Sequence, residues 1–210
     1  MRLLVSGATK VMTEQAAEGV RLGCLGVLVV PAAGNKVTFA RDAGFPAAAD
    51  NSAFTGFDAG AFCRMLGACA DAGVKLDWIA CPDVVCDADE TFRLWGVWQR
   101  RIEAFGYRPA LVLQNGMTIQ DLFILDPPAV FIGGDDGFKL GADVRKMVTW
   151  ANHEKRPVHM GRVNSLKRIL YAEKIGCQSF DGRKWSAWSR TYIPKWVAWC
   201  RRRTKQGTLC

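Results

Sequence analysis

Short apolar runs recur along the chain, and each is closed by glycine or by a short polar side chain. Runs of this length, bounded by turn-forming residues, are typical of buried β-strands. Eight runs fit this description, at residues 2–7, 25–34, 45–51, 76–85, 109–116, 129–136, 157–162 and 177–182. The pattern therefore predicts eight β-strands.

Amphipathic stretches separate several of these runs. They cover residues 58–73, 91–106, 141–154 and 164–176. The first places Phe62, Met65 and Leu66 at helical spacing, which predicts a helix with one buried face. The last begins at Asn164 or Ser165, either of which suits an N-cap, and stops at Gly176.

Strands that alternate with helices favour a parallel sheet with helices outside it. Eight is the number of strands that closes a (β/α)8 TIM barrel. The alternative is an open doubly wound sheet of about six strands, if some runs are not strands. No G-x-G-x-x-G follows the first strand and no G-x-x-x-x-G-K-[ST] occurs, so the usual nucleotide-binding support for that alternative is missing. We expect a compact α/β barrel in a single domain.

Charge divides the 210-residue chain unevenly. Residues 183–210 contain eight of the 28 Lys and Arg residues and none of the 20 Asp and Glu residues, so they carry the whole formal net charge of +8. Four of the eight tryptophans lie in the same stretch. We expect residues 1–182 to form the barrel and residues 183–210 to form a basic, tryptophan-rich helical arm packed on it.

This arm has the composition of a nucleic-acid-binding segment. Cations bind phosphates, and indole rings offer faces on which unpaired bases stack. The candidate contacts are Arg183, Lys184, Trp185, Trp188, Arg190, Arg201, Arg202 and Arg203. In the alternative interpretation, the tryptophans attach the last helix to the barrel and the basic residues are solvated.

The active-site groups of a barrel project from the C-terminal ends of its strands. Here those ends carry Asp50, Asp83, Asp87, Asp89, Gln114, Asn115, Gly133, Gly134, His159, Arg162 and Asp181. One carboxylate of such a set can attack an anomeric carbon while another moves protons, so the set suits glycosidic chemistry. In a structural interpretation, an aspartate caps the next helix, the glycine pair forms a turn and His159 is a core group.

Other classes of site are disfavoured. The eight cysteines form no C-x-x-C pair and have no nearby histidine pair, so we expect no metal site and no cofactor. No apolar run reaches the roughly 18 residues of a membrane span, and the N-terminus meets polar residues too early for a secretory signal. We expect a protein of the cytoplasm, or of the host cytoplasm if it is viral.

Five segments of the chain read, in order, FPAAADNSAFTGF, PDVVCDADET, LVLQNGMTIQDL, VFIGGDDGF and HMGRVNSLKRILYAEKIGCQSFDG. They resemble motifs of the tRNA-guanine transglycosylases and their DNA-modifying relatives, which exchange guanine for a 7-deazaguanine inside an intact polynucleotide. The resemblance implies that Asp181 is the nucleophile and Asp50 the acid/base. It also implies that Asp89 and Gln114 read the base edge, with Gly133 and Gly134 lining the base pocket. His159 and Arg162 are further candidates for substrate binding.

The departures from the family narrow the expected substrate. Ser52, Ala53 and Thr55 differ from the family's first motif, V-G-E does not follow Gly133-Gly134, and the C-x-C-x-x-C…H zinc subdomain is absent. The missing subdomain favours the shorter DNA-acting branch of bacteriophages and bacteria. We therefore expect a pentosyltransferase that acts on DNA, with a free 7-deazaguanine such as preQ0 as co-substrate. A DNA glycosylase, a tRNA enzyme and a non-catalytic nucleic-acid-binding protein remain alternatives.

Overall fold

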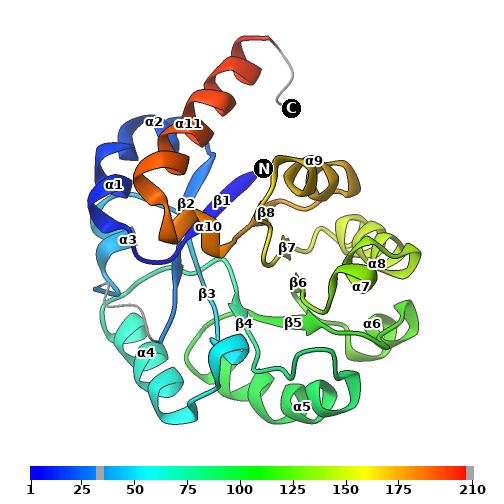
Figure 1. Ribbon diagram of the computed structural model, residues 1–210. Coiled ribbons are helices and arrows are strands. Elements are labelled where there is room, and N and C mark those ends of the chain that lie inside the picture. The colour runs from blue at the N-terminus through cyan, green and yellow to red at the C-terminus, as the bar shows by residue number, and fades with distance from the viewer. Residues whose placement is uncertain (32–35, 207–210) are drawn as a thin grey trace.

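The computed structural model describes residues 1–31 and 36–206. In this part of the chain, eight parallel strands pair in sequence order, and β8 pairs back with β1 to close a barrel (Figure 1). The strands are β1 (Arg2–Val5), β2 (Leu25–Val29), β3 (Ala47–Ala49), β4 (Ile79–Ala80), β5 (Pro109–Leu113), β6 (Val130–Ile132), β7 (Val158–Met160) and β8 (Ser179–Phe180). The predicted TIM barrel is confirmed, and the open sheet is excluded.

Each strand is shorter than the apolar run that predicted it, because described residues at the ends of the runs belong to the adjoining loops. Residues 32–34, at the end of the second predicted strand, lie outside the described residues. Side chains alternate along the strands between two layers. Leu4, Leu28 and Val112 point into the barrel, whereas Leu3 and Leu25 pack between the strands and the helices.

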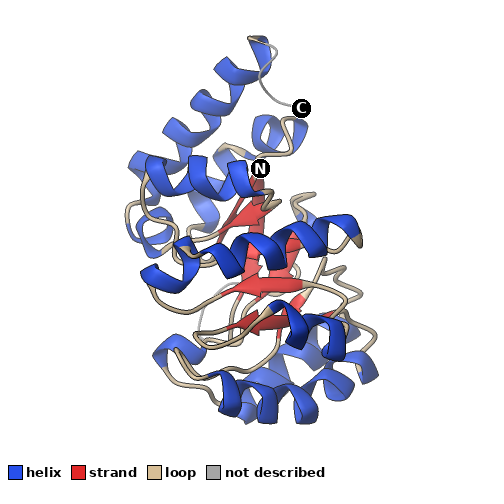
Figure 2. Ribbon diagram, turned by 90° about the vertical axis from the view of Figure 1, so that its right-hand side faces the viewer, coloured by secondary structure: helices blue, strands red, loops and turns tan. Residues whose placement is uncertain are grey.

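Helices surround the strands on the outside of the barrel (Figure 2). Four of them, α4, α5, α8 and α9, correspond to the four predicted amphipathic stretches. The helices are α1 (Thr9–Glu14), α2 (Ala16–Arg21), α3 (Phe39–Asp42), α4 (Ala59–Asp71), α5 (Ala88–Ala104), α6 (Ile119–Leu125), α7 (Asp136–Leu140), α8 (Ala142–His153), α9 (Leu166–Ile175), α10 (Arg183–Ala187) and α11 (Ser189–Lys205), with a short 3-10 helix at Ala53–Thr55. Ser165 rather than Asn164 caps α9, because its side chain accepts the N–H of Arg168.

Helices α10 and α11 follow β8, and Figure 1 shows α11 beside α1 and α2 with its far end beyond the barrel. The indole N–H of Trp185 donates to the carbonyl of Val163 (2.8 Å), and that of Trp196 donates to the carbonyl of Cys24 (2.8 Å). Both side chains are buried, so these two tryptophans attach the C-terminal helices to the barrel. The prediction that Trp185 stacks on nucleic acid is wrong for this reason. Residues 207–210 lie outside the described residues.

Two further features concern the whole described chain. The helices found in residues 1–31 and 36–206 are too short or too polar to cross a lipid bilayer. The cysteines of the same ranges are all free thiols, and most are buried among apolar side chains, as expected for small hydrophobic residues. Cys86 is the exposed exception.

Candidate active site

The C-terminal ends of the strands surround a hollow with a volume of about 70 Å³. The sequence candidates that line it are Asp50, Gln114, Gly133, Gly134, Arg162 and Asp181. Residues far apart in the chain therefore meet at one mouth of the barrel, as the fold requires of strand-end side chains. The volume is well below the roughly 300–1,000 Å³ of typical ligand pockets, so a purine needs the mouth to widen.

Asp89, the residue predicted to read the base, is not among the residues that line this hollow. It lies in the first turn of α5 with an exposed side chain. The helix begins at Ala88, one residue before Asp89, because the side chain of Asp87 caps it by accepting the N–H of Glu90 (3.0 Å). In this first turn the side chain at position 89 points away from the mouth. Asp83, six residues earlier in the loop after β4, lines the hollow instead.

Asp83 is held by two buried amides. Its Oδ1 accepts from Nδ2 of Asn51 (2.8 Å), and its Oδ2 accepts from Nε2 of Gln114 (2.6 Å). The orientation of Gln114 is fixed at the other end too, since its Oε1 accepts the N–H of Cys86 (2.8 Å). Burial raises the pKa of Asp83 to about 6, although the two amide donors act in the opposite direction. Apart from its place beside Asp50, no feature of the sequence marks Asn51 as a site residue.

Asp181 is oriented by groups on β7 and the loop after it. Its Oδ1 accepts the backbone N–H of Arg162 (2.9 Å) and lies 3.3 Å from Nε2 of His159. His159 is fully buried, with its ring between those of Trp78 and Phe131 (centroids at 4.8 and 4.7 Å). Burial lowers its pKa, so the ring is a neutral imidazole that donates to Asp181.

His159 therefore positions the carboxylate and does not contact a ligand in the hollow, which corrects its predicted role in substrate binding. Its other ring nitrogen, Nδ1, lies 2.9 Å from the hydroxyl of Ser179. With the imidazole neutral and Nε2 protonated, Nδ1 accepts from that hydroxyl. This hydrogen bond from Ser179 fixes the orientation of the His159 ring on the side opposite Asp181, as supporting hydrogen bonds do in other functional sites.

Asp50 faces the same space from the end of β3. Its Oδ1 accepts the N–H of Ser52 (2.9 Å). Burial, followed by the negative charges of Asp181 and Asp83, raises the pKa of Asp50 to about 7. A carboxyl group with this pKa is about half protonated at neutral pH, so it can both give and take a proton.

The glycines of the site are required by close packing. A Cβ at Gly133 would lie 2.6 Å from Nε2 of Gln114 and 2.9 Å from the carbonyl oxygen of Leu113. Gly134 has a φ of +72°, which side-chain-bearing residues rarely adopt, and a Cβ there would meet Phe138 at 2.6 Å. Any side chain at these positions would disturb Gln114 or the start of α7.

Two cationic groups complete the lining. Lys139 on α7, which the sequence analysis missed, is buried and donates from Nζ to the carbonyl of Gly161 (2.8 Å). Arg162 has a φ of +61°, and its guanidinium lies 4.1 Å from the ring centroid of Phe54. Phe54 is 63% exposed, so this pair covers part of the mouth from two different loops. Nothing in the sequence around Lys139 marked it, because its burial depends on where α7 lies.

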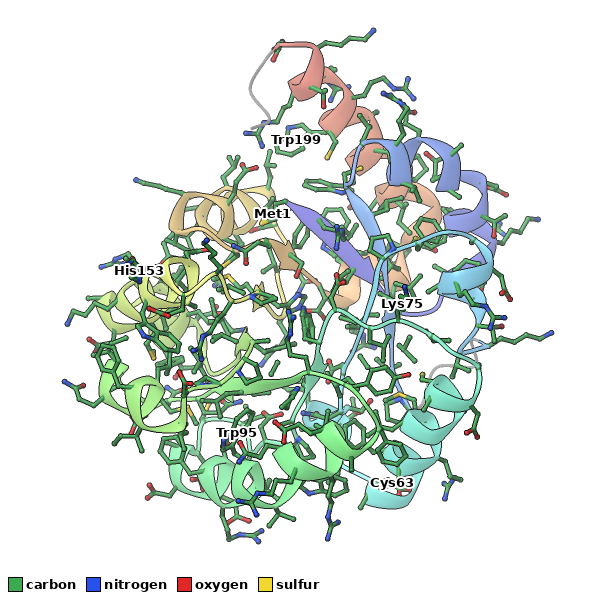
Figure 3. The ribbon with its side chains drawn as sticks, turned by 180° about the vertical axis from the view of Figure 1, so that it is seen from behind. Met1, Cys63, Lys75, Trp95, His153 and Trp199 are labelled. Atoms are coloured by element: carbon green, nitrogen blue, oxygen red, sulfur yellow. The ribbon has the colours of Figure 1, made fainter. Side chains whose placement is uncertain are left out.

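A larger cavity, of about 500 Å³, opens at the opposite end of the barrel. Met1, Lys75 and His153, labelled in Figure 3, precede β1, β4 and β7 and so belong to that end. Among the described residues that line this cavity, Asp77 is the one carboxylate, and it is paired with Arg2 at 3.0 Å. The cluster of three carboxyl groups thus lies at the C-terminal mouth, and not at this end.

The predicted nucleic-acid contacts fall into two groups. The guanidinium of Arg201 pairs with Glu18, and that of Arg203 pairs with Glu173 (2.7 Å) and lies over the ring of Trp199. These contacts tie α11 to α2 and α9. Arg183, Trp188, Arg190 and Arg202 are exposed, as is Arg201 beside its ion pair, while Lys184 lies half-buried over the ring of Tyr192.

The described part of the chain holds no group of three or more His, Cys, Asp or Glu side chains arranged to bind a metal ion. The chemistry available in the hollow is that of three carboxyl groups in different environments, two amides, an amine and a guanidinium. No protein-family model matches the chain, and no curated protein matches it either.

Proposed function

We propose that the protein replaces guanine in DNA with a 7-deazaguanine through a covalent aspartyl-glycosyl intermediate. The observation that carries the proposal is the meeting of Asp50, Asp83 and Asp181, from three strand ends, around one hollow. The resemblance of five segments to the transglycosylases supports the same reaction. The proposal keeps the expected roles of Asp50 and Asp181 and gives the base-reading role to Asp83.

In the first step, Asp181 attacks C1′ of the target nucleotide. Both contacts that orient this carboxylate fall on Oδ1, so the attack is assigned to Oδ2. A C1′–O bond forms, the C1′–N9 bond breaks, and its electron pair leaves with the guanine. Protonated Asp50 supplies a proton to the departing base, which avoids the release of an anion.

In the second step, the incoming 7-deazaguanine takes the place of guanine. Asp50, now ionised, removes the proton from N9 of the new base as N9 attacks C1′, and Asp181 leaves as a carboxylate. Two displacements at one carbon preserve its configuration, as in retaining glycosidases. The pKa of about 7 at Asp50 suits a group that acts in both directions.

Base recognition is assigned to Asp83. Each of its oxygens accepts one amide N–H, and a carboxylate oxygen can accept two, so one site on each oxygen is available. Guanine and 7-deazaguanine present two adjacent donors, N1–H and the exocyclic amine, which match the two oxygens of a carboxylate. Adenine presents one donor, its exocyclic amine, beside an acceptor at N1, so it would leave one oxygen of Asp83 without a partner and facing a lone pair.

A base inside a duplex is not accessible to the hollow, so the substrate is a flipped nucleotide or a single strand. Three exposed side chains follow Asp181 within nine residues of the chain: Arg183, Trp188 and Arg190. They can contact phosphates and an unstacked base next to the target.

The test is incubation of the protein with DNA and isotopically labelled guanine or preQ0, with tRNA in parallel. We expect label to enter DNA, and we expect Asp181→Asn to abolish both exchange and the covalent adduct that forms without free base. Release of guanine without uptake of label would make the protein a DNA glycosylase. Label in tRNA alone, or an adduct mapped to another residue, would overturn the proposal.

A further inference from the structure

Lys139 is a buried amine that the exchange mechanism does not use. Lys139 lines the hollow, and the residue is 3% exposed. Its hydrogen bond to the carbonyl of Gly161 (2.8 Å) employs one of three possible donors. Among the described residues, no carboxylate oxygen lies within 4.0 Å of this Nζ. A buried ammonium without a paired carboxylate is unfavourable, which favours the neutral amine.

The Lys139 amine and the Asp181 carboxylate both approach the same short stretch of backbone, at Gly161 and Arg162. Lys139 contacts the carbonyl of Gly161, and a Cβ built at Gly161 would lie 3.5 Å from Oδ1 of Asp181. Both side chains also line the hollow. A sugar carbon placed for attack by Asp181 is therefore close to the Lys139 amine.

The charges around Lys139 act in both directions. Burial, followed by the guanidinium of Arg162, lowers the pKa of Lys139 to about 8. Arg168 acts in the same direction, while Asp181 and Asp136 oppose it; Arg168 and Asp136 are themselves paired. About half of the amine is thus unprotonated near pH 8, whereas an ordinary lysine is almost fully protonated there. Desolvation and a cationic neighbour are the two features that activate lysine as a nucleophile.

We propose that Lys139 is a reactive amine that forms an imine with the C1′ aldehyde of an abasic nucleotide held in the hollow. The nitrogen lone pair forms the C–N bond, and the carbonyl electron pair moves to oxygen. One proton from nitrogen and one from solvent then leave with that oxygen as water, giving an iminium ion. The inference rests on the proposed function for its substrate class, because the hollow must admit a nucleotide of DNA.

Such a reaction has a place beside base exchange. When water rather than a new base intercepts the Asp181 ester, the product is an abasic nucleotide whose sugar opens to an aldehyde. An amine in the wall of the same hollow captures this aldehyde reversibly. Capture holds the damaged strand on the protein instead of releasing it.

The test uses the full chain and a single-stranded oligonucleotide with one preformed abasic site, incubated near pH 8 with sodium cyanoborohydride. The hydride converts the iminium ion into a stable secondary amine, which appears as a protein–DNA complex under denaturing conditions. We expect peptide mass spectrometry to place the link on Lys139. We also expect the yield to rise as the pH is raised through about 8.

Lys139→Arg keeps a cation and a donor for Gly161 but has no amine that deprotonates, so the yield should fall at least about tenfold. Lys146→Gln is the matched control, because Lys146 is an exposed lysine on α8 paired with Asp143. Thermal unfolding checks that the variants fold. An adduct of unchanged yield in Lys139→Arg, or no adduct from wild-type protein that binds the oligonucleotide, would refute the inference. Base exchange is measured separately with labelled guanine, so its absence beside a Lys139 adduct would reject the proposed function alone.

Discussion

At the scale of single residues, the site shows how one residue type acquires different properties. Asp50 and Asp83 are both half-buried, but Asp83 accepts two amide donors whereas Asp50 faces the charge of Asp181. The pKa of Asp50 is therefore raised further, to about 7, than that of Asp83, at about 6. Asp181 is aligned by a backbone N–H and a neutral histidine. Separation of pKa values among neighbouring carboxyl groups divides acid, base and recognition roles.

The raised pKa of Asp50 predicts a pH dependence. Asp50 is protonated below pH 7 and loses its proton as the pH rises through about 7, so adduct formation without free base should slow about tenfold per pH unit above that value. In Asp50→Asn this decline should be absent, and the rate should be about a hundredfold to ten-thousandfold lower. Quenched-flow detection of the adduct measures both. A decline near pH 7 that survives in Asp50→Asn would assign the titration to another group.

Asp83 and Asp89 form a matched pair for testing base recognition. Asp83→Asn replaces one acceptor oxygen by an amide NH2 and removes the negative charge, so at least one hydrogen bond to the base, worth about 1.5–3 kcal/mol, is lost and kcat/KM for guanine should fall at least about tenfold. Asp89→Asn should leave kcat/KM unchanged, because Asp89 lies outside the hollow on α5. Steady-state exchange assays with labelled guanine compare the two. The opposite ranking would restore Asp89 as the base-reading residue.

At the scale of elements, α10 and α11 combine attachment with exposure. Trp185 and Trp196 pack against Phe180 of β8 (centroids at 5.8 and 5.2 Å), while Trp188, between the two helices, is 66% exposed. The same elements that hold the C-terminus on the barrel thus also present an exposed indole, seven residues after Asp181 in the chain. In this segment a tryptophan's role follows from where the backbone places it rather than from its residue type.

This division predicts opposite outcomes for two tryptophan substitutions. Trp185→Ala should lower the free energy of unfolding by about 3–5 kcal/mol, because it removes a buried ring. Trp188→Ala should leave stability within about 0.5 kcal/mol of wild type, but weaken binding to single-stranded DNA by about 1–3 kcal/mol. Chemical denaturation and fluorescence anisotropy measure the two quantities. Unchanged affinity in Trp188→Ala would remove base stacking from the role of this segment.

At the scale of the whole molecule, the barrel could be predicted because every strand carries its own local signal. An apolar run closed by glycine or a polar residue predicts a strand even when its boundaries are misplaced by a residue or two. Eight such runs that alternate with helices are compatible with few topologies. The position of the mouth followed from the topology, and with it the gathering of Asp50, Gln114 and Asp181. These features depend on the order of elements and not on side-chain detail.

The remaining parts of the site depend on geometry that the sequence does not encode locally. Asp83 and Asp89 are six residues apart, and the start of α5 decides which of them faces the hollow. Lys139 is buried through contact with Gly161, 22 residues later in the chain. Trp185 and Trp188 share a composition and a neighbourhood, yet one is buried and the other exposed. A single residue of shift in a helix start would reverse such assignments.

Arg162 makes two contacts that do not depend on each other. Its backbone N–H donates to Asp181 and orients that carboxylate, while its guanidinium packs on the ring of Phe54 across the opening. Under the proposed function, the guanidinium would have to move aside to admit a nucleobase, but the peptide group need not move with it. The backbone N–H of Arg162 would then keep Asp181 oriented after one base has left and before the next one binds.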